Sequence, residues 1–199
     1  MENLSFSDEN VGWPSYVDFL CTFVFVLILF VGSLLYILSG DIRRREFKSM
    51  ATGFGTVLTG HGIAFTVDVE GRKIRLPLKG QVDFDPGESA ILPRHEAYLR
   101  NIGSILAQAP GSKRIIVLGF ADRTPFEGDP FGNWRLSAVR ALSVLRFFYN
   151  CHDCGYDVEI RKQLTLTGEG DIGASQTNAT NAEDRRVDII IDFGVQDGR

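Results

Sequence analysis

The sequence predicts one N-terminal membrane-spanning helix followed by an α/β domain, an α+β two-layer sandwich. Residues 17–38 form a run of 22 residues that is apolar or uncharged except for one carboxylate. Further along, residues 93–108 and 133–149 repeat apolar residues at helical spacing, whereas residues 187–193 alternate apolar and acidic residues as a strand does. Strands separated by helices that cover one face give a two-layer sandwich.

The N-terminal apolar run fits a membrane helix. At about 1.5 Å per residue it is long enough to cross the roughly 30 Å hydrocarbon core of a bilayer. It is too long for a signal-peptide core, and acidic instead of basic residues precede it. We therefore divide the chain into a cytoplasmic tail (1–13), an uncleaved transmembrane helix (14–40), a connector (41–63) and a globular domain (64–199).

One carboxylate, Asp18, stands near the start of this run. An acid at the centre of a membrane helix costs about 2.5–3.5 kcal/mol, so its presence calls for a functional reason. Desolvation pushes a carboxyl group toward its protonated form, which would let Asp18 load and release protons. The alternative is an interfacial acid about one turn inside the helix, where the macrodipole favours negative charge and Pro14 suits the first helical position.

The basic residues near the span indicate an orientation. No Lys or Arg precedes the span, whereas Arg43, Arg44, Arg45 and Lys48 follow it closely. The positive-inside rule would leave the C-terminal domain in the cytoplasm.

The connector carries four apolar residues at helical spacing until two glycines end the pattern. It could extend the membrane helix, form a dimer contact, lie on the membrane as an amphipathic segment, or be a solvated connector. The apolar residues are Phe47, Met50, Phe54 and Val57, and the glycines are Gly60 and Gly62.

The domain is expected to begin with a hairpin of strands 64–69 and 73–78, in which Pro77 suggests an edge position. In the helix expected at 133–149, leucine and valine repeat every third residue, and this repeat predicts its buried face. The remaining elements expected are a helix at 93–108, a strand at 115–118, the helix at 133–149 with Leu136, Val139, Leu142 and Leu145 on its apolar face, a strand at 164–167, a loop at 169–183 and a last strand at 187–193.

Two cysteines, Cys151 and Cys154, form a CxxC motif. Such a motif can be a redox centre, half of a zinc site or a small disulfide. No second CxxC or histidine pair completes tetrahedral zinc, because His61 and His95 are scattered. In a periplasmic domain a local disulfide is favoured over a reactive dithiol, and free structural thiols are the remaining alternative.

Composition excludes several function classes. The net charge is −4 and the pI about 5.4, with no basic stripe, which argues against nucleic acid as a partner. No nucleophile–base pair, phosphate loop or metal cluster stands out, so the sequence predicts neither an enzyme nor a bound cofactor.

Five blocks over residues 82–193 resemble the motifs of OmpA-like peptidoglycan-binding domains, in the family's order. They are FDPGESAIL (84–92), GFAD (119–122, similar to G-H-T-D), NWRLSAVRA (133–141, similar to N-x-x-L-S-x-x-R-A), GE (168–169) and DRRVD (184–188, similar to N-R-R-V-E).

The resemblance implies a site for the diaminopimelate of a cell-wall stem peptide. This zwitterionic group suits a carboxylate for its ammonium and a guanidinium for its carboxylate, roles that fall on Asp122 and Arg140. Asn133 and Arg185 are candidates for supporting contacts. The alternative is that Asp122 caps its loop and pairs with Arg140 structurally. Three residues depart from the family pattern: Phe120, Ala121 and Asp184.

Upstream, WPSYVDF (13–19) resembles the W…Y-A-D motif that opens the membrane helix of MotB-type stator subunits. The resemblance implies that Asp18 carries the ion, with Tyr16 in the same motif. Thr22 lies one residue from the place of a hydroxyl that the family often keeps. The expected ion is a proton, which one acid can carry, whereas sodium would need further oxygen ligands.

The stator resemblance also implies partners and a location. Two copies of the chain would form a homodimer whose helices stand inside a ring of five A-type subunits in the inner-membrane lipid bilayer. The C-terminal domain would be periplasmic and bound to peptidoglycan, so insertion with the partner would overrule the basic cluster at 43–45.

Four functional alternatives follow. The acidic tail, short connector and W-x-S-Y-x-D pattern look most like the B subunit of Zorya antiphage systems (ZorB), where a motor senses invasion. Flagellar MotB, which usually has a basic tail and a longer linker with a plug, comes second. A passive OmpA-like wall tether without an ion path is an alternative of another class, and a TolR-like energy transducer is disfavoured.

Overall fold

The structure is a computed structural model, and it describes residues 13–109, 113–124, 129–155, 161–172, 174 and 182–194. The chain divides into two units, Met1–Arg45 and Glu46–Arg199. One helix, α1 (Trp13–Gly60), begins in the first unit and ends in the second.

The first unit consists of the N-terminal part of α1. This helix is long and apolar enough to cross a membrane, with a mean hydropathy of 2.7 in its most apolar window. Every side chain from residue 16 to residue 38 is exposed. Most of these side chains are large and apolar, and the described residues do not cover them. Their burial would require lipid or other helices.

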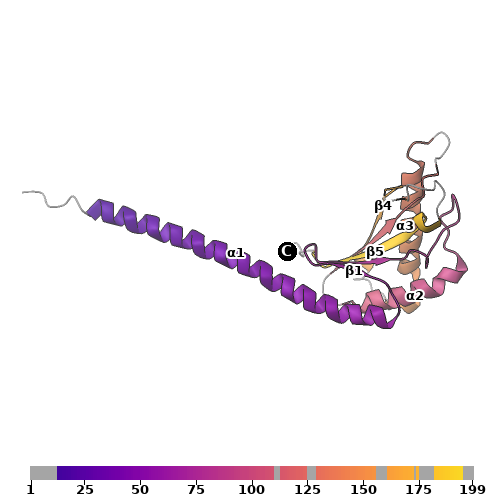
Figure 1. Cartoon of the computed structure of the whole chain (residues 1–199), viewed down its shortest axis with the longest axis horizontal. Coiled ribbons are helices and arrows are strands. Elements are labelled where there is room, and N and C mark those ends of the chain that lie inside the picture. The colour runs from indigo at the N-terminus through magenta and orange to yellow at the C-terminus, as the bar shows by residue number, and fades with distance from the viewer. Residues whose placement is uncertain are drawn as a thin grey trace, which may run out of the picture. The chain divides into compact units, whose positions relative to one another are not determined.

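The second unit is built on a five-stranded mixed sheet (Figure 1), with strand order β1-β2-β5-β3-β4. All neighbouring strands run antiparallel except β3 and β4, which are parallel and joined through a helix. The strands are β1 (Thr66–Asp68), β2 (Lys73–Pro77), β3 (Arg114–Gly119), β4 (Leu164–Gly168) and β5 (Val187–Asp192); the helices are α2 (Pro93–Gln108) and α3 (Gly132–Asn150), with the short 3₁₀ turns η1 (His152–Cys154) and η2 (Ala182–Asp184).

A single core lies between one face of the sheet and the helices. On β5 the alternating residues Val187, Ile189 and Ile191 are fully buried, and Phe193 continues them. On the helices, Leu99 and Ile102 of α2 join the same apolar cluster. The predicted two-layer α/β sandwich after an apolar helix is confirmed.

The predicted edge position of β2 is wrong, since β1 and β5 flank it on its two sides. Pro77 is tolerated because β1 is short and reaches only as far as Arg75. The backbone N–H of Leu78 donates to Val187 of β5, so the nitrogen of Pro77 faces the other side, beyond the end of β1.

The segment assigned to a connector (41–63) is largely part of the folded unit, which begins at Glu46 and not at residue 64. Phe47, Phe54 and Leu58 of α1 are buried in the domain core, and the ring of Phe47 lies 5.8 Å from that of Phe193. Val57, expected on the same apolar face, is exposed. The apolar spacing therefore reflects packing on this domain.

The buried face of α3 also differs from the predicted one. Its buried residues include Ser137, Arg140 and Val144, whereas Val139 is exposed and the three leucines of the predicted stripe are only partly buried. The face of α3 is set by close packing on β3 and by an arginine, two features that apolar periodicity does not report.

The contact between β3 and α3 depends on a glycine. A Cβ atom on Gly119 would lie 1.9 Å from the carbonyl oxygen of Ser137, a backbone atom that cannot move away alone. We expect Gly119→Ala to lower the free energy of unfolding by about 3 kcal/mol or more. Chemical denaturation of the full-length chain in detergent measures this change.

The matched control is Gly53→Ala in α1, where an added Cβ would meet no atom within 4 Å. This change should leave stability unchanged or raise it by about 0.5–1 kcal/mol, because alanine favours the helix. Equal effects of the two substitutions would contradict the proposed packing.

Candidate functional site

The candidate site is organised around Arg140, whose side chain is fully buried. Its Nε donates to the carbonyl oxygen of Glu88 (2.9 Å), Nη1 to that of Phe120 (3.1 Å) and Nη2 to that of Asp85 (3.2 Å). The guanidinium also lies over the ring of Phe84, 5.3 Å from its centroid. One side chain of α3 thus joins the 84–88 loop to the end of β3.

The surroundings of Arg140 partly disfavour its positive charge, because the side chain is buried and lies near Arg185. Burial lowers the pKa of Arg140 to about 10; the nearby carboxylate of Asp122 raises it and the positive charge of Arg185 lowers it further. This pKa is still well above 7, so the guanidinium is charged at neutral pH. Three carbonyl oxygens and one carboxylate compensate its lost hydration.

Asp122 lies just beyond β3 and is also buried. Its Oδ2 accepts a hydrogen bond of 2.9 Å from Nη1 of Arg185, and its Oδ1 accepts one from the backbone N–H of Thr124. Arg185 in turn donates through Nε to the carbonyl oxygen of Phe84. The structure therefore brings Asp122, Arg140 and Arg185 together, with Arg185 and not Arg140 as the direct partner of the carboxylate.

Asn133 lies in the first turn of α3. Its Oδ1 is buried and accepts no hydrogen bond from the described residues. Among these residues, no described contact joins Asn133 to Asp122 or Arg140. Asn133 thus offers a buried acceptor atom about two helical turns before Arg140 on α3.

The residues predicted to serve ion passage lie in the first unit. Asp18 and Thr22 are exposed and four residues apart, which puts them on one face of α1. Tyr16, also exposed, is only two residues from Asp18 and lies on another face. Within the described part of the chain, no side-chain hydrogen bond or ion pair reaches any of the three.

Cys151 and Cys154 are joined in a disulfide, one of the alternatives left open by the sequence. The bridge spans the turn after α3, and Cys154 packs against α2 where a Cβ on Gly103 would lie 2.6 Å from its Sγ. Within the described residues no group of three or more metal-ligating side chains occurs.

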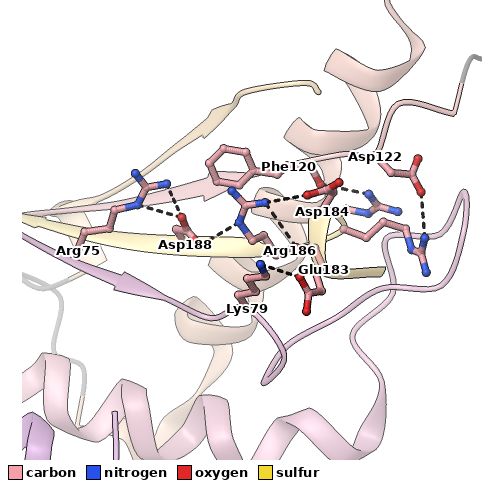
Figure 2. Close-up of polar contacts among 10 residues, drawn as sticks. Arg75, Lys79, Phe120, Asp122, Glu183, Asp184, Arg186 and Asp188 are labelled. Carbon is pink, nitrogen blue, oxygen red and sulfur yellow. Dashed lines mark hydrogen bonds and ion pairs between the residues drawn. The ribbon is translucent and has the colours of Figure 1, made fainter. Parts of the chain in front are cut away.

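Two features of the structure around the site could not be predicted from the sequence. The first is the set of backbone carbonyls at Asp85, Glu88 and Phe120, which no side-chain pattern reports. The second is a charged row on the open face of the sheet (Figure 2), which includes Arg75 and Asp188. Alternation on β5 correctly directed Asp188 away from the core but did not predict that it is buried there.

The role of Arg140 in holding the loops gives a prediction. Arg140→Lys keeps the positive charge but cannot donate to three carbonyl oxygens in the same fork. We expect a loss of about 2–4 kcal/mol in the free energy of unfolding, because buried acceptors are left unpaired. Arg146→Lys, on the exposed face of the same helix, is the control and should be neutral. Denaturation curves that coincide for the two variants would rule out this role.

Comparison with known proteins assigns the family. The family model described as the OmpA family matches residues 83–188. The uncharacterized protein YtxE of Bacillus subtilis is 32% identical over 124 residues, covering 60% of this chain and 48% of YtxE. The chain therefore spans about half the length of this curated relative.

Solved structures show the same fold. The crystal structure of a MotB-like protein of Desulfovibrio vulgaris superposes with a TM-score of 0.61 at 25% identity, covering 77% of this chain and 98% of that one. The periplasmic domain of Helicobacter pylori MotB gives a TM-score of 0.51 at 24% identity, covering 63% and 76%. The chain consists of an apolar helix long enough to cross a membrane, followed by a domain similar in structure to MotB-like proteins. Since the family model covers more than half of the sequence, this chain belongs to the OmpA family.

Proposed function

We propose that the chain is the B subunit of an ion-driven rotary motor that is anchored to peptidoglycan in the inner membrane. The observation that carries this proposal is the pairing, in one polypeptide, of a lone carboxylate on an apolar helix with an OmpA-family domain that holds a buried charged cluster. A tether needs only the second feature, whereas a motor needs both.

The domain would bind the diaminopimelate of a stem peptide at Asp122, Arg140 and Arg185. A zwitterion can exchange with an existing ion pair: its ammonium would join Asp122 while its carboxylate takes N–H groups of Arg185. Arg140 would act mainly by positioning, because three of its donors already bind carbonyl oxygens. Asn133, with an unsatisfied Oδ1, would offer an additional acceptor.

The membrane helix would carry a proton at Asp18, with Thr22 on the same face and Tyr16 nearby. Because these side chains are exposed in the isolated chain, an ion path requires other helices around them. A homodimer inside a ring of five A-type subunits would supply that cover. Sodium, in place of a proton, would need oxygen ligands from the A subunits.

A periplasmic location of the domain is supported by the disulfide between Cys151 and Cys154, because such bonds persist in oxidising compartments. The basic cluster at 43–45 argues for the opposite orientation. Wall binding requires the periplasmic side, and insertion together with an A subunit would overcome the charge bias. A C-terminal topology reporter tests this location directly.

Among motors, a ZorB-like role in antiphage defence is favoured over a flagellar MotB role. Acidic residues precede the span, and only residues 41–45 separate the assigned span from the compact unit. This spacing leaves little chain for the plug and linker of flagellar subunits. Genes next to this one distinguish the two, since Zorya systems pair an A subunit with helicase or nuclease genes.

The binding site gives a direct prediction. Asp122→Asn removes the carboxylate charge with little change in shape, so affinity of the full-length chain for peptidoglycan fragments and for meso-diaminopimelate should fall about 10- to 100-fold. Calorimetry in detergent measures this loss. Asp153→Asn, an exposed acid beyond α3, should bind as the unmodified chain does. Unchanged affinity of the Asp122 variant in a folded protein would exclude this site.

The ion path gives a second prediction. Asp18→Asn should abolish the activity of the motor in cells, scored as phage protection or motility, because the amide cannot carry a proton. Membrane insertion and binding to meso-diaminopimelate should persist, since the substitution lies outside the domain. Retained activity of the Asn variant would favour the passive tether instead.

A further inference from the structure

A second charged pocket lies on the open face of the sheet, outside the site described above. It encloses about 350 Å³ and is lined by residues that include Arg75, Lys79, Arg186 and Asp188. The core-facing helices do not cover it, because Arg75 and Asp188 alternate with the buried residues of β2 and β5. Figure 2 shows Arg75 and Arg186 on either side of Asp188 and near the ring of Phe120, with Lys79 beside Glu183.

The floor of this pocket holds an unsatisfied acceptor. Asp188 is 1% exposed, and its Oδ2 accepts hydrogen bonds from Nε and Nη2 of Arg75. Its Oδ1 is buried and accepts no hydrogen bond from the described residues, and Nε of Arg186 lies 3.7 Å from it. A buried carboxylate oxygen in this state favours a ligand that donates an N–H or O–H.

The rim of the pocket carries three cations, Arg75, Lys79 and Arg186, and also the buried carboxylate of Asp184, which lies 3.7 Å from Nη1 of Arg186. Nη1 of Arg75 donates no hydrogen bond to the described residues, and the side chain of Arg75 is 43% exposed. Lys79 is half exposed and pairs with Glu183 at 2.7 Å, a surface ion pair of small net energy that a ligand can replace. Arg186 is fixed by its stacking on Phe120, 4.3 Å from the ring centroid. The two exposed cations, Arg75 and Lys79, are therefore the groups that can bind an anion at this rim.

An acceptor at the floor and cations at the rim suit the C-terminal residue of a peptide. Its free carboxylate would bind Arg75 and Lys79, and its amide N–H would donate to Oδ1 of Asp188. A carboxylate without a neighbouring N–H would leave Oδ1 unsatisfied.

The distance to the diaminopimelate site fits the same peptide. Asp188 lies opposite Leu118 on β3, and Asp122 follows Leu118 by four residues. Four residues span at most about 13 Å, which sets an upper limit on the separation of Leu118 and Asp122. A peptide of a few residues can therefore reach from one site to the other along the end of β3.

We propose that the pocket formed by Arg75, Lys79 and Asp188 is a second subsite, which binds the terminal carboxylate and last amide of a cell-wall stem peptide. This inference rests on the proposed function, because it assumes that the domain binds such peptides. It adds that the protein distinguishes stem peptides by their free C-terminus.

The experiment compares two peptides on the full-length chain in detergent. One is a stem tetrapeptide with meso-diaminopimelate at its third position and a free C-terminal carboxylate; the other is the same peptide as its C-terminal carboxamide. Calorimetry should show about tenfold tighter binding of the free acid. Lys79→Gln and Arg75→Lys, which keeps a cation beside Asp188, should each reduce this preference at least threefold while affinity for meso-diaminopimelate alone stays unchanged.

The control is Arg100→Gln on α2, which forms an exposed ion pair with Glu96 and should keep the full preference. Equal affinity for the acid and the amide in the unmodified chain overturns the second subsite, even if meso-diaminopimelate binds. A preference that survives both pocket variants also overturns it. Absence of meso-diaminopimelate binding, with neither peptide bound, refutes the proposed function and this inference with it.

Discussion

The buried guanidinium of Arg140 is the interaction on which the rest of the domain depends. It ties α3 to the 84–88 loop and to the end of β3 through three carbonyl oxygens contributed by segments far apart in sequence. Burying an ion without such partners costs several kcal/mol, so the loops must keep these positions for the domain to fold. Asp122 and Arg185 lie beside this guanidinium. The contacts that stabilise the domain therefore also set the geometry of the candidate site.

Elements with a strong local period could be predicted from the sequence. The strand at Val187–Asp192 and the helix at Pro93–Gln108 match their expected bounds closely, because apolar alternation and helical spacing reflect burial on one side. The buried face of α3 could not be predicted this way, since a fully buried arginine occupies it and the leucine stripe lies at its margin. The partners of the site were likewise hidden, because Arg140 binds backbone atoms, which carry no residue identity.

Residues 46–60 show that one pattern of apolar spacing is compatible with several different structural roles. Phe47 and Phe54 at helical spacing suit a dimer contact, a membrane-surface helix or a domain core equally well, and only tertiary structure distinguishes these uses. In the structure they fill the core beside Phe193, and Leu58 is completely buried. A fragment that begins at residue 64 would therefore expose a set of core side chains, so studies of binding should keep the chain from Glu46 onward.

The energetics of the proposed motor link the two units of the chain. A unit charge that crosses a potential of 100 mV releases about 2.3 kcal/mol, whereas a bare carboxylate at the bilayer centre costs about 2.5–3.5 kcal/mol. Because that cost exceeds the gain, the potential alone would not drive an uncovered carboxylate to the bilayer centre. In the proposed motor, Asp18 would therefore need partner helices that lower this cost, and torque would act only while the domain is held still. Under this proposal, the ion path and the wall site would each have no mechanical effect without the other.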